Sequence, residues 1–343
     1  MANPETIYVG IDLGTSRTSI TTSTGVRKTV WSYVGYPEDH VARKMLGGRE
    51  RIFGEEAVEN RMSVDLHRPL AGGVIKDDEK SRRAVRDLLQ HVMEVAEIPN
   101  GQTIYGVIGA PAEASVDSKA AIIEAASDFM DSIVVCSEPF SVAYGLDFLG
   151  DTLVVDIGAG TVDLCRVHGT MPKAEDQRTH HNAGDAIDTR LAEEISKAYP
   201  EAQFSERMIR DIKESHSSVS KNMDPVRVSF PVKGKPQEFD VTDQVHAACF
   251  SLVGPTVEAL QDLIATYDPE FQAQMRDNVL LGGGGSQIRG LARAVEEALQ
   301  EYGGGKVRSV EEPQFAGSNG ALKIALDLPE EYWQEFIHAR AKS

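Results

Sequence analysis

Two segments of the chain repeat one pattern, and this repeat constrains the fold more than any other feature. The first reads Ile-Asp-Leu-Gly-Thr from Ile11, and the second reads Asp-Ile-Gly-Ala-Gly-Thr from Asp156. Each follows an apolar strand, turns through glycine and continues into a second β-rich run that a glycine closes, Gly25 or Gly169. Asp12 and Asp156 are 144 residues apart (156 − 12). One supersecondary unit repeated once at that distance predicts two related lobes, because a solenoid needs short periods.

Helical patterns occupy the rest of each lobe. Residues 78–96 carry apolar side chains at a spacing that makes one apolar face. Similar patterns predict helices over residues 119–130, 186–198 and 291–302. Because strand and helix patterns alternate, the expected class is α/β, with a mixed sheet in each lobe flanked by helices.

The length of 343 residues is more than one ordinary core needs. We expect a first lobe over residues 1–150 and a second lobe over residues 151–319, with residues 320–343 returning to the first. Residues 32–69 are charged and irregular and include the Gly47-Gly48 pair. This stretch is expected to be a small subdomain inserted in the first lobe.

The charge balance argues against two classes of partner. Asp and Glu number 53 against 35 Lys and Arg, a formal net charge of -18. So acidic a surface repels nucleic acid and anionic lipids, and it makes self-association sensitive to salt. Solubility alone is an equally good explanation of the charge.

Cysteine usage and the N-terminus indicate the compartment. Cys136, Cys165 and Cys249 each lie in an apolar run, which predicts buried free thiols rather than a disulfide framework or a zinc site. Residues 1–6 lack the basic and apolar regions of a signal peptide, and no apolar stretch approaches the roughly 20 residues of a membrane span. We therefore expect a cytoplasmic protein.

A strand that ends in Asp and turns through glycine combines two binding groups. The turn's backbone N–H groups can hold a phosphate, and the carboxylate can hold the water of a metal ion. One such turn more often has only structural meaning. Two copies at lobe-scale spacing predict a pair of phosphate-binding hairpins, with Asp12 and Asp156 on either side of a Mg²⁺-phosphate.

A third glycine cluster, residues 282–285, follows an apolar strand. Four consecutive glycines let a backbone approach a base or sugar closely, and residues 287–298 then predict a helix whose N-terminus favours negative charge. A flexible loop is the alternative interpretation.

The order of these motifs resembles the actin, Hsp70 and sugar-kinase superfamily over nearly the whole chain. Residues 11–15 resemble its first phosphate motif, 137–145 its connecting motif, 156–163 its second phosphate motif and 281–286 its adenosine motif. Residues 210–214 resemble the helix over which actins lay the adenosine. The resemblance implies an actin-like ATPase fold, with ATP or ADP and Mg²⁺ in a cleft between two lobes.

The resemblance also implies roles for single residues. Asp12 and Asp156 would hold Mg²⁺ through water, and Glu138 would orient or deprotonate the attacking water. The residues expected to bind the phosphates are Gly14, Thr15, Ser16, Gly158, Ala159, Gly160 and Thr161. The residues expected around the adenosine are Arg210, Lys213, Glu214, Gly283, Gly284 and Gly285, with Gly184 and Asp185 behind the second hairpin.

Each of these assignments has a structural alternative. Glu138 precedes Pro139 and would also suit the start of a helix. Lys213 and Glu214 could be an exposed helix pair. The pair from His180 to His181 has metal-binding residue types, but a solvated turn is the favoured interpretation. The pair Tyr332-Trp333 is expected to pack in the core of the first lobe.

The chain also departs from the superfamily pattern. Val162 stands where the second phosphate motif often has a second Thr, and the first phosphate turn lacks the Lys of conventional actin. Mg²⁺ and backbone donors would then have to meet the phosphate charge.

Within the superfamily, the chain is most similar to the actin-like filament proteins that align magnetosomes in magnetotactic bacteria. The residues that carry this likeness are 34–37, 42–44, 137–140, 284–286, 288–291, 328–329 and 332–333. It implies a cytoplasmic ATPase that polymerises with its own subunits, with magnetosome-associated proteins as further partners.

The alternatives are other filaments and other ATPases. An MreB-type cell-shape filament is expected to carry a membrane anchor, which residues 1–6 do not offer, and a plasmid-segregation filament is a further possibility. A chaperone would need a β-rich substrate domain and a sugar kinase an acceptor pocket, usually in a longer chain.

Overall fold

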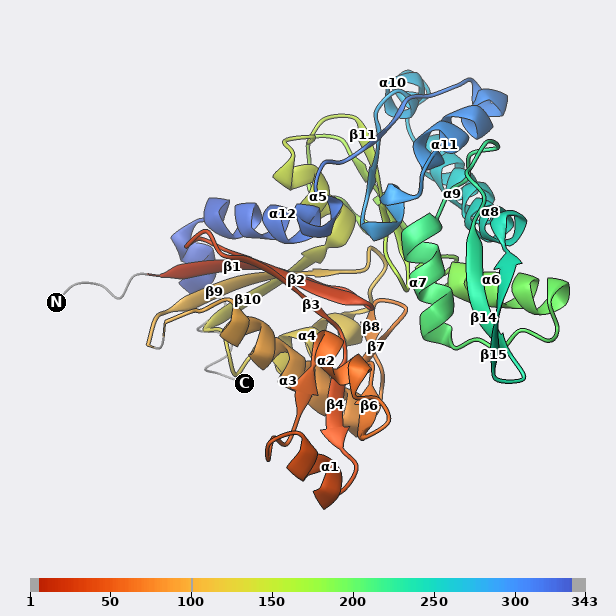
Figure 1. The fold of residues 1–343 in the computed structure, drawn as a ribbon. Helices are drawn as coiled ribbons and strands as arrows, with labels where there is room; N and C mark the ends of the chain where they lie inside the picture. Colours follow the sequence, from red (N-terminus) through yellow and green to blue (C-terminus); the bar gives the residue numbers. More distant parts are fainter. Residues whose placement is uncertain (1–5, 100, 335–343) are drawn as a thin grey trace. The chain divides into compact units, whose positions relative to one another are not determined.

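The computed structural model describes residues 6–99 and 101–334, and it divides into two compact units. Unit 1 contains Met1–Leu149 together with Gln314–Ser343, and unit 2 contains Gly150–Pro313. Unit 1 is therefore built from both ends of the chain, coloured red to yellow and dark blue (Figure 1). Of the segment expected to return to the first lobe, residues 335–343 lie outside the described residues.

A five-stranded mixed sheet forms the centre of unit 1. Its strands are β1 (Ile7–Leu13), β2 (Arg17–Thr22), β3 (Arg27–Trp31), β9 (Ile104–Ala110) and β10 (Ser132–Ser137). Their order is β10-β9-β1-β2-β3, in which β1 pairs antiparallel with β2 and parallel with β9. The helices of this unit outside its small subdomain are α3 (Glu79–Val95), α4 (Val116–Ala126), α5 (Glu138–Gly145) and α12 (Pro313–Asp327).

Different helices cover the two faces of β1. Val9 and Ile11 are fully buried in one hydrophobic cluster with residues of α3 and α4. The opposite face packs against α12, where a Cβ on Gly10 would lie 2.2 Å from the backbone nitrogen of Leu322 (Figure 1). Because side chains alternate along a strand, Asp12 shares the α12 face with Gly10.

Residues 32–69 form a small sheet with short helices, so the expectation of an irregular stretch was wrong. Their strands pair in the order β5-β4-β6 around a core of their own that includes Tyr33, Ile52 and Val64. Strands of 2 to 4 residues are too short to show an alternating pattern in the sequence. The elements are β4 (Val34–Pro37), α1 (His40–Met45), β5 (Ile52–Phe53), α2 (Gly54–Glu59) and β6 (Val64–His67), followed by the hairpin of β7 (Leu70–Ala71) and β8 (Val74–Ile75).

Unit 2 contains a second five-stranded sheet with the same connectivity. Its strands are β11 (Thr152–Ile157), β12 (Val162–Val167), β13 (Gln177–His180), β16 (Val279–Gly282) and β17 (Val307–Ser309). In the order β13-β12-β11-β16-β17, β11 pairs antiparallel with β12 and parallel with β16, as β1 does with β2 and β9. The repeated sequence motif therefore corresponds to a duplicated sheet, and the expected α/β class is confirmed.

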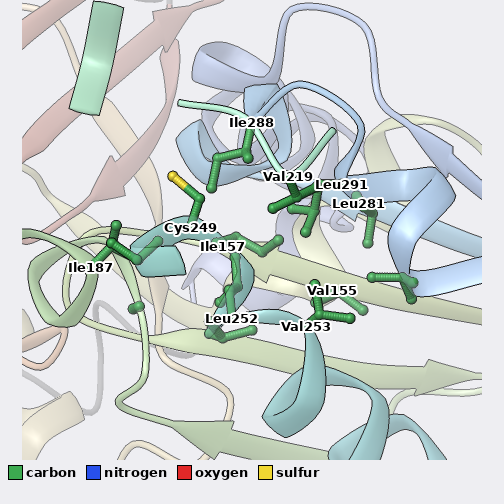
Figure 2. Packing of buried hydrophobic residues seen from close by; sticks show 14 of the residues in the cluster. Val155, Ile157, Ile187, Val219, Cys249, Leu252, Val253, Leu281, Ile288 and Leu291 are labelled. Atoms are coloured by element: carbon green, nitrogen blue, oxygen red, sulfur yellow. The ribbon is translucent and has the colours of Figure 1, made fainter. Parts of the chain in front are cut away.

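The core of unit 2 joins this sheet to helices that lie between β13 and β16 and between β16 and β17 in the chain. Figure 2 shows Val155 and Ile157 of β11 in one cluster of buried apolar side chains with Ile187 of α6, Leu291 of α11 and Leu252, which lies just before α9. The remaining elements are α6 (Gly184–Ala198), α7 (Glu206–His216), β14 (Arg227–Val232), β15 (Lys235–Asp240), α8 (Thr242–Phe250), α9 (Val253–Ala265), α10 (Gln272–Arg276) and α11 (Leu291–Leu299), with short 3₁₀ turns η1 (Ala174–Asp176), η2 (Gly284–Gln287) and η3 (Gln300–Tyr302).

The predicted helices are present, with shifted ends. The helix expected over residues 78–96 is α3, whose N-cap Asp78 accepts a hydrogen bond from the backbone N–H of Ser81 at 2.8 Å. The helix expected to open at Gln287 begins instead at Leu291. Gly290 is its N-cap and has a φ of 82°, so the chain reverses there before the helix can start.

All three cysteines are buried and free, as their apolar surroundings predicted. Burial raises the pKa of the Cys136 and Cys165 thiols to about 12 and that of Cys249 to about 11. In the described part of the chain, no helix is long and apolar enough to cross a membrane. Of residues 1–6, from which no membrane anchor was expected, residues 1–5 lie outside the described part.

The aromatic pair near the C-terminus is only half in the core. Trp333 is fully buried and stacks on Tyr105 with ring centroids 4.9 Å apart, as expected. Tyr332 is 48% exposed, so its predicted burial was wrong. Residues 330–334 are helical, and because neighbouring residues of a helix point in different directions, only one of the two aromatic residues can face the sheet.

Candidate functional site

The turn between β1 and β2, residues 14–16, is held by side chains from other segments. Ser32 Oγ donates to the Gly14 carbonyl at 2.7 Å, and Arg68 Nε donates to the Thr15 carbonyl at 2.9 Å. The Thr15 side chain is buried, and its Oγ1 accepts from the backbone N–H of Gly73 at 2.9 Å. The Thr15 hydroxyl is therefore turned toward the β7–β8 hairpin.

Ser32, Arg68 and Gly73 were not identified from the sequence. The Gly72-Gly73 pair carried a usable signal, because two glycines between short apolar runs are typical of a two-residue hairpin turn. Both have positive φ, 55° and 73°. The signal predicts the hairpin but not its contact with Thr15, which depends on tertiary packing.

Glu138 and Asp12 lie at the same edge of the unit 1 sheet. Asp12 pairs in register with Gly109 of β9. A Cβ on Gly109 would lie 3.0 Å from the Glu138 side chain, so Glu138 packs directly over this strand end. Glu138 is also the first residue of α5, with Pro139 in the first turn, and this satisfies the structural alternative as well.

The pKa of the buried Cys136 thiol responds to the negative charge at this edge of the sheet. Burial is the main cause of its raised pKa, the hydrogen bond with Ser141 opposes it, and the carboxylates of Glu138 and Asp12 raise it further. Both carboxylates therefore act on one buried atom. Negative charge gathered at a strand end in this way suits a bound cation.

The turn between β11 and β12 presents its backbone at the surface. Asp156 is buried at 7% exposure, while Gly158 is exposed and Ala159 half-buried. The Gly158 N–H donates to the Thr161 carbonyl at 2.9 Å, which closes the turn. Gly160 and Thr161 are buried, so residues 158 and 159 form the accessible part of this turn.

Gly184 and Asp185 lie directly against this turn, and α6 begins there. The Gly184 N–H donates to the Gly158 carbonyl at 3.1 Å, and the Asp185 N–H donates to the Ala159 carbonyl at 2.8 Å. A Cβ on Gly184 would lie 3.1 Å from the Ala159 Cα, so the close approach depends on glycine. The structure thus brings together two segments that the sequence placed in one site.

The glycine run after β16 packs on the end of β11. A Cβ on Gly283, whose φ is 69°, would lie 2.2 Å from Asp156 Oδ1, and a Cβ on Gly285 would lie 2.2 Å from Ile157 Cγ2. A Cβ on Gly284 would meet nothing within 4 Å. Gly283 and Gly285 therefore pack closely on the end of β11, while the Cβ position of Gly284 is open.

The α7 residues divide between burial and exposure. Lys213 is 14% exposed in its side chain and donates to the Gly184 carbonyl at 2.8 Å, so it is not an exposed helix residue. Arg210 is 22% exposed and lies 3.9 Å from Asp185. Glu214 is exposed. Asp188, which pairs with both Lys213 and Arg210, was missed because nothing near it in sequence marks it.

The interpretation of the histidine pair as a solvated turn was wrong for His180. It is the last residue of β13, and among the described residues neither ring nitrogen has a hydrogen-bond partner although both are buried. Burial, with a smaller effect from His181, lowers the pKa of His180 to about 4. His181 is exposed. Over residues 6–99 and 101–334, no group of three or more His, Cys, Asp or Glu side chains is arranged to hold a metal ion directly.

With this geometry described, the family follows from comparison with known proteins. The family model for MreB/Mbl protein matches residues 6–330. The chain therefore belongs to the MreB/Mbl family, and the expected membership of the actin-like superfamily is confirmed.

Within this family, the chain is similar to MamK. It is 40% identical over 330 residues to the actin-like protein MamK of Paramagnetospirillum magneticum, covering 96% of this chain and 95% of that protein. It matches the structure of the MamK double helical filament with a TM-score of 0.92 and 40% identity, covering 95% of this chain and all of that one (100%). It also matches a non-polymerising MamK mutant bound to AMPPNP, with a TM-score of 0.72 and 39% identity over 94% of this chain and 100% of that one. The expected likeness to the filament proteins of magnetotactic bacteria is confirmed.

Proposed function

We propose that this chain binds ATP with Mg²⁺, hydrolyses it to ADP and phosphate, and forms filaments of its own subunits in an ATP-dependent way. The observation that carries the proposal is the duplicated sheet. Asp12 and Asp156 occupy equivalent positions at the ends of β1 and β11, each followed by a glycine-containing turn. Similarity to a MamK filament supports the proposed assembly, and similarity to a MamK mutant bound to AMPPNP supports the proposed nucleotide binding.

The residues at both turns fit a Mg²⁺–nucleotide. Carboxylate oxygens are the ligands that Mg²⁺ prefers, and it commonly keeps several of its waters, so Asp12 and Asp156 suit contact through water. When bound, Mg²⁺ neutralises phosphate charge during phosphoryl transfer. The residues proposed to bind the phosphates are Gly14, Thr15, Ser16, Gly158, Ala159, Gly160 and Thr161.

The remaining site residues have two tasks in this proposal. Glu138, beside the strand end that carries Asp12, orients or deprotonates the attacking water. Gly184 and Asp185 support the second turn through their backbone hydrogen bonds. The residues proposed on the adenosine side are Arg210, Lys213, Glu214, Gly283, Gly284 and Gly285.

We further propose that the filaments belong to the cytoplasmic cytoskeleton and align magnetosomes, with magnetosome-associated proteins as partners. The similarity to MamK over 96% of the chain supports this role. Hydrolysis would then release subunits and give the filament its turnover.

Sedimentation tests the assembly directly. The purified chain is centrifuged with Mg²⁺ and ATP, with Mg²⁺ and ADP, and without nucleotide, while phosphate release is followed in parallel. We expect most pelleting with ATP and release of phosphate. Equal pelleting in all three conditions, together with no heat of ATP binding in calorimetry, would contradict the proposal.

A further inference from the structure

We propose that Asp188 is a positioning residue of the nucleotide site, which fixes the basic residues of α7 and, through them, the second phosphate turn. The inference rests on the proposed nucleotide binding. Asp188 lies on α6, one turn after Gly184. Its effect is exerted through Lys213 and Arg210.

Two cations of α7 converge on the Asp188 carboxylate. Lys213 Nζ lies 2.8 Å from Oδ1, and Arg210 Nε lies 3.4 Å from Oδ2. All three side chains are largely buried, with exposures of 14% for Asp188 and Lys213 and 22% for Arg210. The carboxylate therefore joins two helices at one point rather than forming a surface ion pair.

The charge of Asp188 depends on these partners. Burial raises the pKa of its carboxyl group, while Lys213 and Arg210 act in the opposite direction. The Lys213 ammonium lies nearest Oδ1 and the Arg210 guanidinium nearest Oδ2, so the two cations together balance this carboxylate. Removing one member of such a buried group leaves the others without charge compensation.

Lys213 links Asp188 to the phosphate turn. Its Nζ also donates to the Gly184 carbonyl at 2.8 Å, on the residue whose own N–H donates to Gly158. Asp185 continues the connection with its N–H to the Ala159 carbonyl. One carboxylate thus holds the ammonium that ties α7 to the start of α6 and hence to residues 158 and 159.

Asp188 is expected to act by positioning Lys213 and Arg210 and not by touching the nucleotide itself. The Asp188 carboxylate is occupied by two protein cations, and a free carboxylate near a polyphosphate would repel it. Its contribution to binding is therefore to keep Lys213 and Arg210 in one orientation before the nucleotide arrives, which lowers the ordering cost of binding.

The test is nucleotide affinity in the Asp188→Asn variant, which keeps the shape of the side chain and removes its charge. By analogy with other residues that orient a binding group, we expect about a 10-fold loss of affinity for both ATP and ADP in calorimetry. The Glu194→Gln variant is the matched control, because Glu194 is on the same helix and pairs with Lys197 at 3.2 Å away from this group. It should bind as the wild type does.

Thermal unfolding of the nucleotide-free protein separates positioning from stability. If Asp188 were only structural, Asp188→Asn would lower the unfolding temperature and leave the affinity of the folded protein unchanged, which would overturn the inference. If Asp188→Asn does not fold, the double variant Asp188→Asn with Lys213→Met removes both charges of the ion pair together. Wild-type nucleotide affinity in this double variant would also overturn the inference. A wild-type protein that binds no nucleotide would instead refute the proposed function itself.

Discussion

At the scale of single residues, the two strand ends carry the same carboxylate with different neighbours. Asp12 pairs in register with Ser19 and Gly109, and Asp156 pairs with Asp163 and Gly282. Asp163 is almost fully buried and accepts a hydrogen bond from Thr179 Oγ1 at 2.6 Å. The duplication therefore preserves the carboxylate and the glycine at each strand end, while the hairpin partner differs between the units.

The first prediction concerns Glu138. In the Glu138→Ala variant we expect ATP binding to be kept and hydrolysis to slow by about 100-fold or more, since positioning of the water acts on the transition state. Single-turnover phosphate release measures the rate, and the exposed Glu124→Ala on α4 is the control. Filaments of the Glu138 variant should persist longer. Unchanged phosphate release would remove Glu138 from the mechanism.

His180 gives a prediction about pH. Its pKa is about 4 in the folded protein and 6.5 as the ordinary value, so between these pH values the folded state binds fewer protons than the unfolded state. The His180 contribution to the free energy of unfolding therefore decreases as pH falls from 6.5 to about 4. Below about pH 4 this contribution no longer changes with pH. His180→Phe should show a flatter pH dependence in urea unfolding than the wild type. Identical slopes for wild type and His180→Phe would contradict the burial argument.

At the scale of elements, the contact between α5 and α12 depends on glycine. A Cβ on Gly320 of α12 would lie 1.8 Å from the Ser141 carbonyl oxygen, and a Cβ on Gly145 of α5 would lie 2.8 Å from the Gly320 Cα. Both contacts are with backbone, which cannot rotate away as a side chain can. The two helices can therefore approach only where neither has a side chain.

Replacing a helical glycine by alanine should change the free energy of unfolding in opposite directions at Gly320, inside this contact, and at Gly254, outside it. Gly320→Ala should lower the free energy of unfolding by about 3 kcal/mol because it overpacks the contact. Gly254→Ala in α9, where a Cβ would meet nothing within 4 Å, should raise it by about 0.5 kcal/mol by restricting the unfolded chain. Urea unfolding measures both. A similar sign for the two variants would show that the contact is more adaptable than its distances suggest.

The elements also show how far the sequence can be interpreted. Long periodic helices such as α3 and strands that end in a short motif, such as β1 and β11, could be predicted because their signals are local. The short strands of residues 32–69 could not, because two to four residues do not establish a period.

The same limit applies to the candidate site. Asp12, Asp156 and Glu138 lie in contiguous motifs, so their types and spacing suffice to propose them. Arg68 and Asp188 act through partners that are distant in sequence, at Thr15 and Lys213. Such contacts exist only once the fold has formed, and no local pattern indicates them.

At the scale of the whole molecule, the net charge predicts how assembly responds to salt. Each subunit carries a formal charge of -18, so bringing subunits together costs repulsion that counterions must screen. The Debye length falls from about 30 Å at 0.01 M salt to about 8 Å at 0.15 M. We expect light scattering with ATP to increase over this range.

The salt series has two informative alternatives. Scattering that falls steadily with salt would mean that attractive charge pairs in the contact outweigh the repulsion, and the filament proposal would stand. No scattering at any salt or protein concentration would contradict the filament proposal itself. Repeating the series with ADP separates a general effect of charge from assembly that requires ATP.

The construction of unit 1 from both ends of the chain has a consequence for biosynthesis. Thr21 Oγ1 of β2 lies 3.0 Å from Ser318 Oγ of α12, and the two residues are 297 positions apart. At roughly 5–20 residues per second, a ribosome needs about 15–60 s to make the intervening chain. Unit 2 is continuous, so all of it is made before the rest of α12, which covers one face of β1. Premature termination directly after residue 313 would therefore release a chain with a complete unit 2 and an open unit 1 sheet, which is a substrate for chaperones or proteases rather than a subunit.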